Sequence, residues 1–240
     1  MSKVQAFSLG QVANVMVTDQ WSNPLDMYTA GGINYVRATH GQVYKVVVSN
    51  QYGNRIAAVT AVDNIDVMSG RTSDFTKDTG LIAEPWGSTT FDGWRVNDRQ
   101  TDQFKFSVVE RDTVVVQLTG NRHHQGLIEL GLFQDYVRPV YRDRFGSLGG
   151  LTRGGGMAKG FGEATSGSVG TAAGDRQQSL VHADYSFRRS TLSPIATVMI
   201  FPKSGWYLHQ HGIDMAQNLA DDLPPSVNQT PSPFNNIRHV

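Results

Sequence analysis

The sequence contains no cysteine, carries no net charge and has no long hydrophobic run. The lack of cysteine excludes disulfide bonds, a thiolate nucleophile and cysteine-ligated zinc. Lysine plus arginine equals aspartate plus glutamate, 21 each, so the whole chain creates no field that recruits nucleic acid or an anionic membrane. No stretch reaches the ~18 apolar residues of a membrane span, and the first residues lack the apolar segment of a signal peptide. We therefore expect a protein made in the cytoplasm that does not engage a membrane.

Extended helical periodicity and β–α–β alternation are also missing. Short apolar segments instead follow one another at roughly ten-residue spacing, with turn residues between them. They comprise residues 43–49, 56–62, 65–68, 80–83, 89–96, 103–109, 114–118 and 127–133. The turn at residues 52–54 predicts a hairpin between the first two segments. Together the segments predict an all-β fold, an antiparallel β-sandwich with a jelly-roll-like core.

Composition divides the chain into five regions. Breakers interrupt short apolar pieces near the start, glycine dominates a later stretch, and proline dominates the end. The predicted regions are an extended N-terminal arm at 1–40 with one strand near 12–17, a sandwich core at 41–137, a glycine-rich basic arm at 138–177, further strands completing the sandwich at 178–215, and a proline-rich strap at 216–240. Within the fourth region we expect strands at 180–187 and 196–202, and a short strand or helical turn at 206–211.

We do not expect the glycine-rich arm to be ordered by its own contacts. Eleven glycines lie between residues 145 and 175, with few apolar side chains among them. Because glycine loses the most backbone freedom on ordering, we expect neighbouring subunits to hold this arm; the alternative is a loop folded back on its own domain. The residues expected to contact a partner are Arg138, Arg142, Arg144, Arg153, Lys159, Phe161, Pro231, Pro233 and Phe234. A partner protein is favoured over nucleic acid because the chain as a whole is neutral.

Several motifs occur in one order along the chain. Residues 44–50 read YKVVVSN, and residues 62–70 read VDNIDVMSG; the stretches 80–85, 91–95 and 104–107 read GLIAEP, FDGWR and FKFS. Later, residues 170–174 read GTAAG, residues 187–194 read FRRSTLSP, and a closing stretch runs from Leu208 to Ile213. In this order they resemble a poorly characterised family found in proteobacteria and in the virions of tailed phages, and they cover about two-thirds of the chain.

The chain departs from the family pattern at two turns. Asn64 occupies a position that is usually glycine in the family. The family also has a Pro-Gly turn after the strand at residues 80–83, and here Trp86-Gly87 after Pro85 interrupts that pattern. Both departures affect turns rather than chemistry. The resemblance implies a sandwich domain that is a surface or virion component, and it carries no enzymatic activity onto any residue of this chain.

Metal sites are weakly indicated. His209 and His211 could share one face of a strand, but only Asp214 lies nearby in sequence as a third ligand. A calcium site around Asp63, Asn64 and Asp66 would need an acidic loop pattern that is missing here, so a turn stabilised by side-chain bonds to nearby amides is favoured. We expect no metal and no cofactor.

Catalytic and nucleotide-binding patterns are incomplete. Residues 154–160 contain glycines and Lys159 but no following Ser or Thr, and residues 160–162 lack the third glycine of a dinucleotide fingerprint. Ser166 has no G-x-S-x-G elbow. Glu84 and Glu110 are isolated carboxylates. The sequence therefore predicts a protein that is not an enzyme.

Five aromatic residues are predicted to lie in the sandwich core: Trp86, Phe91, Trp94, Phe104 and Phe106. The alternation along residues 103–109 places Phe104 and Phe106 on one face. Trp94 could instead lie on an outer face shared with a neighbour.

These features lead us to expect a structural phage virion protein, most simply a minor capsid, vertex or decoration protein. Its partners would be the major capsid protein or other virion proteins, with homo-oligomers in the particle and the virion as its location. One alternative is a glycan- or receptor-binding module of a tail or cell surface, with Trp86 or Trp94 in the groove. A second is a hydrolase whose pocket gathers His123, His124 and a carboxylate.

Overall fold

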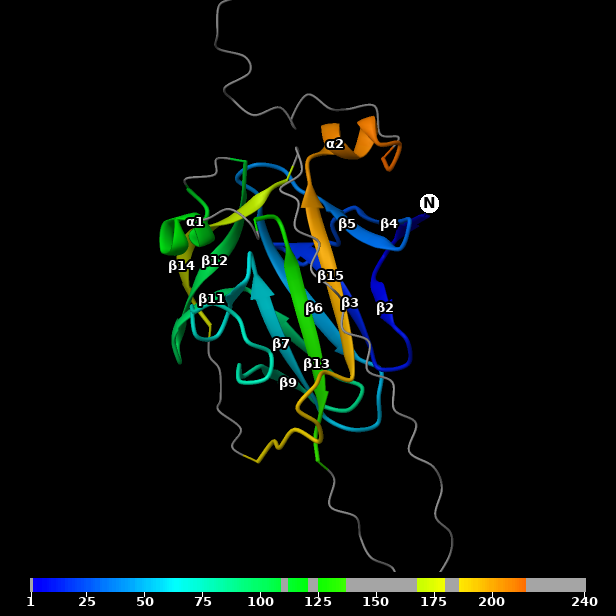
Figure 1. Cartoon of the computed structure of the whole chain (residues 1–240), viewed down its shortest axis with the longest axis vertical. Helices are drawn as coiled ribbons and strands as arrows, with labels where there is room; N and C mark the ends of the chain where they lie inside the picture. The colour runs from blue at the N-terminus through cyan, green and yellow to red at the C-terminus, as the bar shows by residue number, and fades with distance from the viewer. Residues whose placement is uncertain (1, 109–111, 121–124, 137–167, 180–185, 215–240) are drawn as a thin grey trace, which may run out of the picture.

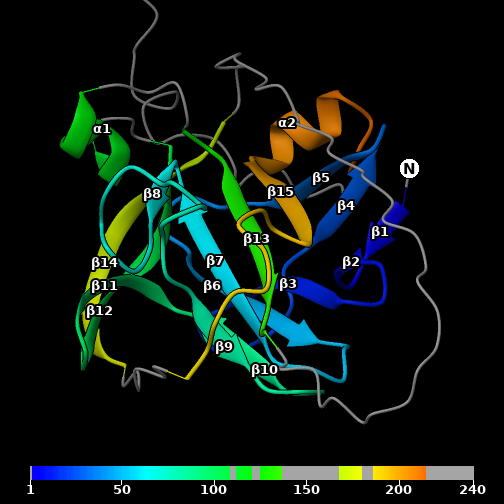
Figure 2. The ribbon, with the colours of Figure 1, turned by 60° about the horizontal axis from the view of Figure 1, so that its bottom comes forward.

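The structure is a computed structural model that describes residues 2–108, 112–120, 125–136, 168–179 and 186–214. Its described part is built mainly of β-strands, arranged in two sheets that pack face to face (Figures 1 and 2). This confirms the predicted all-β sandwich. No helix of the described residues is long and apolar enough to cross a membrane.

The first sheet has eight strands in the described part of the chain. Its order is β1 (Ser2–Val4), β4 (Met27–Ala30), β5 (Ile33–Arg37), β15 (Ala196–Lys203), β13 (Ile128–Gln134), β7 (Ile56–Val62) and β8 (Ile65–Asp66), and β9 (Leu81–Ala83) also pairs with β7. The strands β5 and β15 run parallel, whereas β13 pairs antiparallel with both β15 and β7. Segments from the beginning, middle and end of the chain thus form one sheet.

The second sheet has seven strands among the described residues. Its order is β11 (Gly93–Asn97), β12 (Gln100–Ser107), β6 (Val43–Asn50), β3 (Ala13–Asp19) and β2 (Phe7–Leu9), with β10 (Ser88–Phe91) beside β6 and β14 (Gly170–Gln178) beside β12. Phe106 of β12 is paired with Thr171 of β14, and Phe104 with Tyr44 of β6.

The core lies between the sheets. Alternate residues of β6, including Tyr44, Val46 and Val48, are buried, as the pleat of a strand requires when one face is covered. Tyr44 stacks on Phe106 with ring centroids 4.0 Å apart. A fully buried side chain of this size stabilises a fold by about 1.5–3 kcal/mol.

Strand β7 is buried along its whole length. Its inner residues join the main core, while Ala57 and Val59 form a second cluster with Phe133. Phe75 and Phe187 pack against that cluster from outside the sheet. Because both faces of β7 are buried, its sequence is a continuous run of small and β-branched residues.

The predicted N-terminal arm at residues 1–40 is wrong. The strand expected near residues 12–17 is present as β3, but four more strands belong to this region and lie in both sheets. Met27 and Val36 are fully buried. The breakers taken as signs of an arm form tight turns: Gly31 and Gly32 both have positive φ between β4 and β5.

The hairpin predicted around residues 52–54 is also wrong. The two flanking strands exist with the expected bounds, but β6 belongs to the second sheet and β7 to the first. β6 pairs instead with β3, β10 and β12. The turn at residues 52–54 is therefore a crossover between sheets.

Residues 114–118 form a helix rather than the predicted strand. Helix α1 (Val114–Thr119) ends at Gly120, whose φ of 66° gives the left-handed cap that glycine favours. Residues 206–211 were predicted to form a short strand or helical turn, and the structure has helix α2 (Gly205–Gln210) there, with His211 as its C-cap. Ser204 caps α2 by accepting a hydrogen bond from the Tyr207 amide at 3.3 Å.

The glycine-rich arm predicted at 138–177 is wrong at its C-terminal end. Residues from Gly170 onward form β14, whose first three residues are buried. A Cβ at Gly170 would lie 2.7 Å from Thr113 Cγ2 and 2.5 Å from Gln125 Cγ, so glycine permits this close packing. Residues 137–167 and 215–240, together with most of the strand predicted at 180–187, lie outside the described residues.

Candidate functional site

Three turns meet at one end of the sandwich. They connect β2 to β3, β6 to β7 and β9 to β10, and backbone bonds join them: Gln51 donates to the Val12 carbonyl at 2.8 Å, and Asn50 donates to the Gly87 carbonyl at 2.8 Å. They enclose a shallow hollow of about 630 Å³. The hollow is lined by Ser8, Gly10, Gln11, Asn14, Gln51, Tyr52, Gly53 and Trp86, and we call these residues the Trp86 hollow.

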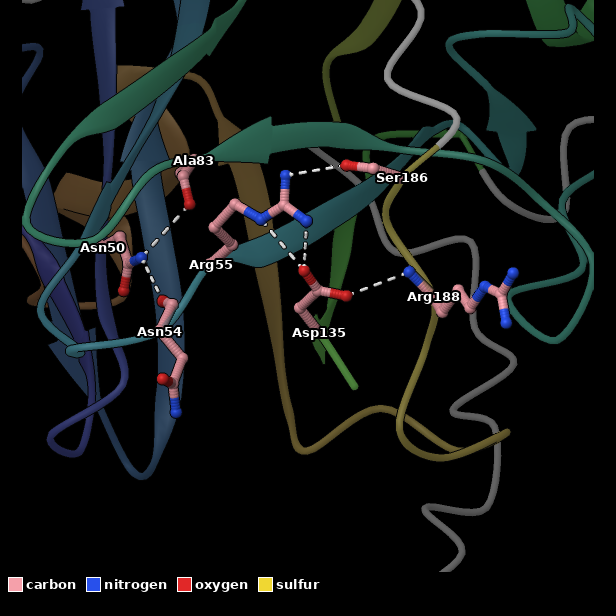
Figure 3. Close-up of polar contacts among 7 residues, drawn as sticks. All are labelled: Asn50, Asn54, Arg55, Ala83, Asp135, Ser186 and Arg188. Carbon is pink, nitrogen blue, oxygen red and sulfur yellow. Dashed lines mark hydrogen bonds and ion pairs between the residues drawn. The ribbon is translucent and has the colours of Figure 1, made fainter. Parts of the chain in front are cut away.

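The buried amide of Asn50 holds two of these turns in place (Figure 3). Its Nδ2 donates to the carbonyl oxygens of Asn54 at 2.8 Å, Ala83 at 3.2 Å and Glu84 at 2.9 Å. Its Oδ1 accepts a hydrogen bond from the Tyr52 amide at 2.9 Å. One side chain thus fixes the backbone on either side of the hollow, which keeps Tyr52 and Trp86 at set positions.

Trp86 has an unusual backbone conformation and an exposed ring. Its φ is +62°, in the left-handed region that side chains other than glycine and asparagine rarely adopt. It follows Pro85 in a turn closed by a 2.9 Å bond from the Gly87 amide to the Glu84 carbonyl, at the position where glycine is normally preferred. The side chain is nonetheless 71% exposed, so the prediction that Trp86 lies in the core is wrong.

Asn64 also has positive φ, 64°. A glycine at either position would adopt this conformation without strain. Asparagine tolerates it well, whereas tryptophan does not. The left-handed conformation therefore costs more at Trp86 than at Asn64, and of the two residues Trp86 places a large side chain in solvent.

A charged cluster ties the chain together near the same end (Figure 3). Arg55 binds the Asp135 carboxylate, with Nε 2.9 Å from Oδ2, and its Nη1 lies 3.2 Å from the Ser186 hydroxyl. The other carboxylate oxygen accepts the Arg188 amide at 3.0 Å. Because Asp135 bonds to both a side chain and a backbone, this cluster fastens residues 186–188 to the end of β13.

Asp63 is buried at the opposite end of the sandwich. Its carboxylate accepts hydrogen bonds from the amides of Gly126 at 2.8 Å, Leu127 at 3.3 Å and Thr171 at 2.7 Å. Burial raises the pKa of Asp63 to about 7, although these three donors oppose the shift. The predicted turn at Asp63 is present, but its side chain bonds distant amides rather than nearby ones.

The remaining predicted metal ligands do not converge. Asp66 accepts the nearby Ser69 amide at 2.7 Å, as expected of a turn residue. His209 and His211 lie on and just after helix α2, where His211 stacks on Tyr207 and Asp214 pairs with Arg37. In the described ranges, no three His, Asp or Glu side chains gather where they could hold a metal ion. His123, His124, Glu110 and Ser166 lie outside those ranges.

The other predicted core aromatics are confirmed. Phe91, Phe104, Phe106 and Trp94 are buried, and the Trp94 ring meets Phe104 edge-on with centroids 4.9 Å apart. Trp94 therefore does not face solvent, and of the two tryptophans considered for a binding groove only Trp86 is exposed.

The predicted partner-contacting residues all lie outside the described residues: Arg138, Arg142, Arg144, Arg153, Lys159, Phe161, Pro231, Pro233 and Phe234. Conversely, the sequence reading missed most of the Trp86 hollow. Gln11 and Asn14 fall in the predicted N-terminal arm, Asn14 within its one predicted strand near 12–17, and Tyr52 falls in the turn of the predicted hairpin. The one usable signal was Trp86 after Pro85, a bulky residue at a position that suits glycine.

Comparison of the chain with protein-family models, with curated proteins and with solved structures found no match.

Proposed function

We propose that this protein is a non-enzymatic structural component of a phage particle, a minor capsid, vertex or decoration protein. The sandwich is its rigid body, and residues 138–161 and 231–234 contact neighbouring subunits. The resemblance to a family with virion members supports the role. The route of the chain through the sandwich is the structural observation that carries it.

The chain leaves and re-enters the sandwich at opposite ends (Figure 1). It leaves after β13, where Gln134 pairs with Ile56. It returns at Ser168, which bridges to Lys203, three residues beyond the Ile200 that pairs with Ile128 at the other end of β13. At about 3.3 Å per residue, these points are roughly 30 Å apart along the strand direction.

The described residues form a continuous core. The main hydrophobic cluster joins side chains from both sheets, including Tyr44, Phe104, Leu130 and Ile200, which are fully buried. Residues 137–167 are far longer than the distance they bridge, since an extended chain covers about 3.3–3.6 Å per residue. They are therefore available for contacts with other subunits, and their arginines suit an acidic surface on a shell protein.

The polar groups inside the sandwich support a structural role. Asp63 and Asp135 use both carboxylate oxygens for backbone or arginine partners, and Asp214 pairs with Arg37. Groups committed in this way rigidify a body. A rigid body with several partner-binding segments gains avidity, because each contact raises the effective concentration of the next.

The test is incorporation into particles. Phage particles assembled in cells that express the tagged full-length chain are banded on a density gradient, and the ratio of this chain to the major capsid protein is measured by mass spectrometry. We expect a fixed ratio that survives banding. Combined substitution of Arg138, Arg142 and Arg144 by Ala, or of Pro231, Pro233 and Phe234 by Ala, should reduce that ratio at least ~10-fold, as expected when one of several linked contacts is lost.

The matched control changes charge elsewhere on the surface. Lys77→Ala removes an exposed cation whose partner is the neighbouring Asp74, and it should leave incorporation unchanged. Absence of the chain from banded particles would refute the proposal, as would equal incorporation of all variants.

A further inference from the structure

We propose that the Trp86 hollow binds a neutral oligosaccharide, with the Trp86 ring as the stacking surface and the surrounding amides as hydrogen-bonding partners. The inference is independent of the virion role, because it concerns a site on the sandwich itself and is tested on the isolated chain. It rests on the aromatic side chains, the polar lining, the lack of charge and the rigidity of the turns.

Two exposed aromatic residues line the same hollow. Trp86 is 71% and Tyr52 37% exposed, although both could gain free energy by burial. Trp86 also holds a backbone conformation that costs on the order of 1–2 kcal/mol for a residue with a Cβ. Strained residues of this kind cluster at ligand sites, so this outlier marks the hollow as a functional candidate.

The rest of the lining is polar and uncharged. Gln11, Asn14 and Gln51 supply amide donors and acceptors, and Ser8 supplies a hydroxyl. A sugar presents the complementary surface: a C–H face that packs on an aromatic ring, and a rim of hydroxyls that both donate and accept. Amide side chains can satisfy such hydroxyls in either role.

Other ligand classes fit this lining less well. It contains no lysine, arginine or histidine to bind a phosphate, sulfate or sialic acid carboxylate. It contains no leucine, isoleucine, valine or methionine to form the apolar pocket into which a peptide side chain would anchor. The volume of about 630 Å³ falls within the ~300–1,000 Å³ typical of small-ligand sites.

The turns around the hollow are held before any ligand arrives. Asn50 bonds to the backbone of both the residue 51–55 and residue 83–84 segments (Figure 3). The Gln51 amide bonds to the Val12 carbonyl in the β2–β3 turn. Loops fixed in this way lose little conformational entropy on binding. Preorganisation matters most for sugars, whose hydroxyls must give up water for each protein contact.

The experiment uses the full-length chain on an array of neutral, sialylated and sulfated glycans, followed by calorimetric titration with the best neutral oligosaccharide. Trp86→Gly is the decisive variant, because glycine removes the ring and relieves the left-handed strain together. We expect at least ~30-fold weaker binding, the usual effect of truncating a central tryptophan, with an unchanged or higher melting temperature. A purely structural role of the ring would lower the melting temperature instead.

Trp21→Ala is the matched control, since Trp21 is 74% exposed and does not line the hollow. It should bind like the original chain. If Trp86→Gly proves unstable, the exposed Gln51→Ala decides, with an expected loss of roughly 5- to 10-fold for one hydrogen-bonding side chain. The proposal is overturned if the array shows no neutral ligand, if only acidic glycans or peptides bind, or if binding survives both Trp86→Gly and Gln51→Ala.

Discussion

Two buried polar side chains, one at each end of the sandwich, join segments that are distant in sequence. Asn50 fastens the turns beside the Trp86 hollow, and Asp63 fastens the start of β14 to the turn before β13. Each makes at least three hydrogen bonds to backbone groups. Since a buried backbone group without a partner costs about 1–3 kcal/mol, both residues should be sensitive to substitution.

Asn50→Ala should lower the free energy of unfolding by about 3 kcal/mol, because it removes the side-chain partner of the Tyr52 amide and of the Asn54 and Ala83 carbonyls, and one of the two bonds to the Glu84 carbonyl. Urea denaturation at pH 7 measures this. Asn97→Ala is the control: Asn97 is exposed and bonds only to Arg99 and Gln100, so its loss should cost under ~1 kcal/mol. Equal effects of the two substitutions would contradict the role assigned to Asn50.

Asp63 should make stability depend on pH. Its pKa is raised by burial from 3.8 to about 7, so the folded state holds this proton more tightly than the unfolded state does. The resulting stabilisation is present at low pH and is lost as pH rises through the folded pKa. Relative to Asp63→Asn, which cannot titrate, the chain should lose about 3 kcal/mol of unfolding free energy between pH 5 and pH 8.

The comparison with Asp63→Asn removes the contributions of other titrating groups. Burial also raises the pKa of Asp66 and of Glu129 and lowers that of Lys203, but these groups are present in both chains. Denaturant unfolding of both chains at several pH values gives the difference directly. A difference that stays constant across pH, or grows with it, would show that the Asp63 pKa is not raised.

At the scale of elements, the strand pair β11–β12 depends on a glycine. A Cβ at Gly93 would lie 2.2 Å from the Asp102 carbonyl oxygen, and backbone atoms cannot yield as a flexible side chain does. Gly93→Ala should therefore lower the unfolding free energy by about 2–4 kcal/mol. Gly53→Ala, where a Cβ meets nothing within 4 Å, should change it by less than ~1 kcal/mol, and denaturant melts of both variants test the contrast.

Alternation and turn residues predicted the central strands well. β6, β7, β12 and β13 lie where the pattern placed them, because a strand with one buried face must alternate and a doubly buried strand must be continuously apolar. The strand predicted at residues 114–118 is wrong because local composition alone does not decide the conformation of so short a segment. Only Val115 is buried in α1, and the αL cap at Gly120 favours helix over strand.

The candidate site was less predictable than the strands. The Trp86 hollow combines the β2–β3, β6–β7 and β9–β10 turns. These turns meet because the chain crosses from the second sheet to the first after β6 ends at Asn50. No spacing in the sequence reveals that crossing. Trp86 was read as core because large aromatic residues usually are; its left-handed backbone conformation, which places the ring in solvent, becomes visible only in the fold.

At the scale of the whole molecule, long-range strand pairing explains why the sequence predicts an extended arm at residues 1–40 where the fold has strands. β5 completes the first sheet by pairing in parallel with β15, about 165 positions later in the chain, as in the contact from Asn34 to the Met199 carbonyl. Short apolar pieces such as β4 and β5 are weak signals alone. They become strands because partners from the end of the chain cover them.

The same long-range closure yields a prediction about residues 137–167. Gln134 and Ser168 lie roughly 30 Å apart at opposite ends of the sandwich, by the rise of the strands between them. A 16-residue Gly-Ser linker in place of residues 137–167 should preserve a cooperative melt, because it reaches up to about 55 Å and leaves every residue of the described core in place. A 4-residue linker, with a reach of about 17 Å, should pull β14 from β12 and abolish the transition.

Thermal unfolding followed by near-ultraviolet circular dichroism distinguishes the two variants. If both variants unfold, the segment contributes to the core itself; if both fold, its ends are closer together than the strand pairing requires.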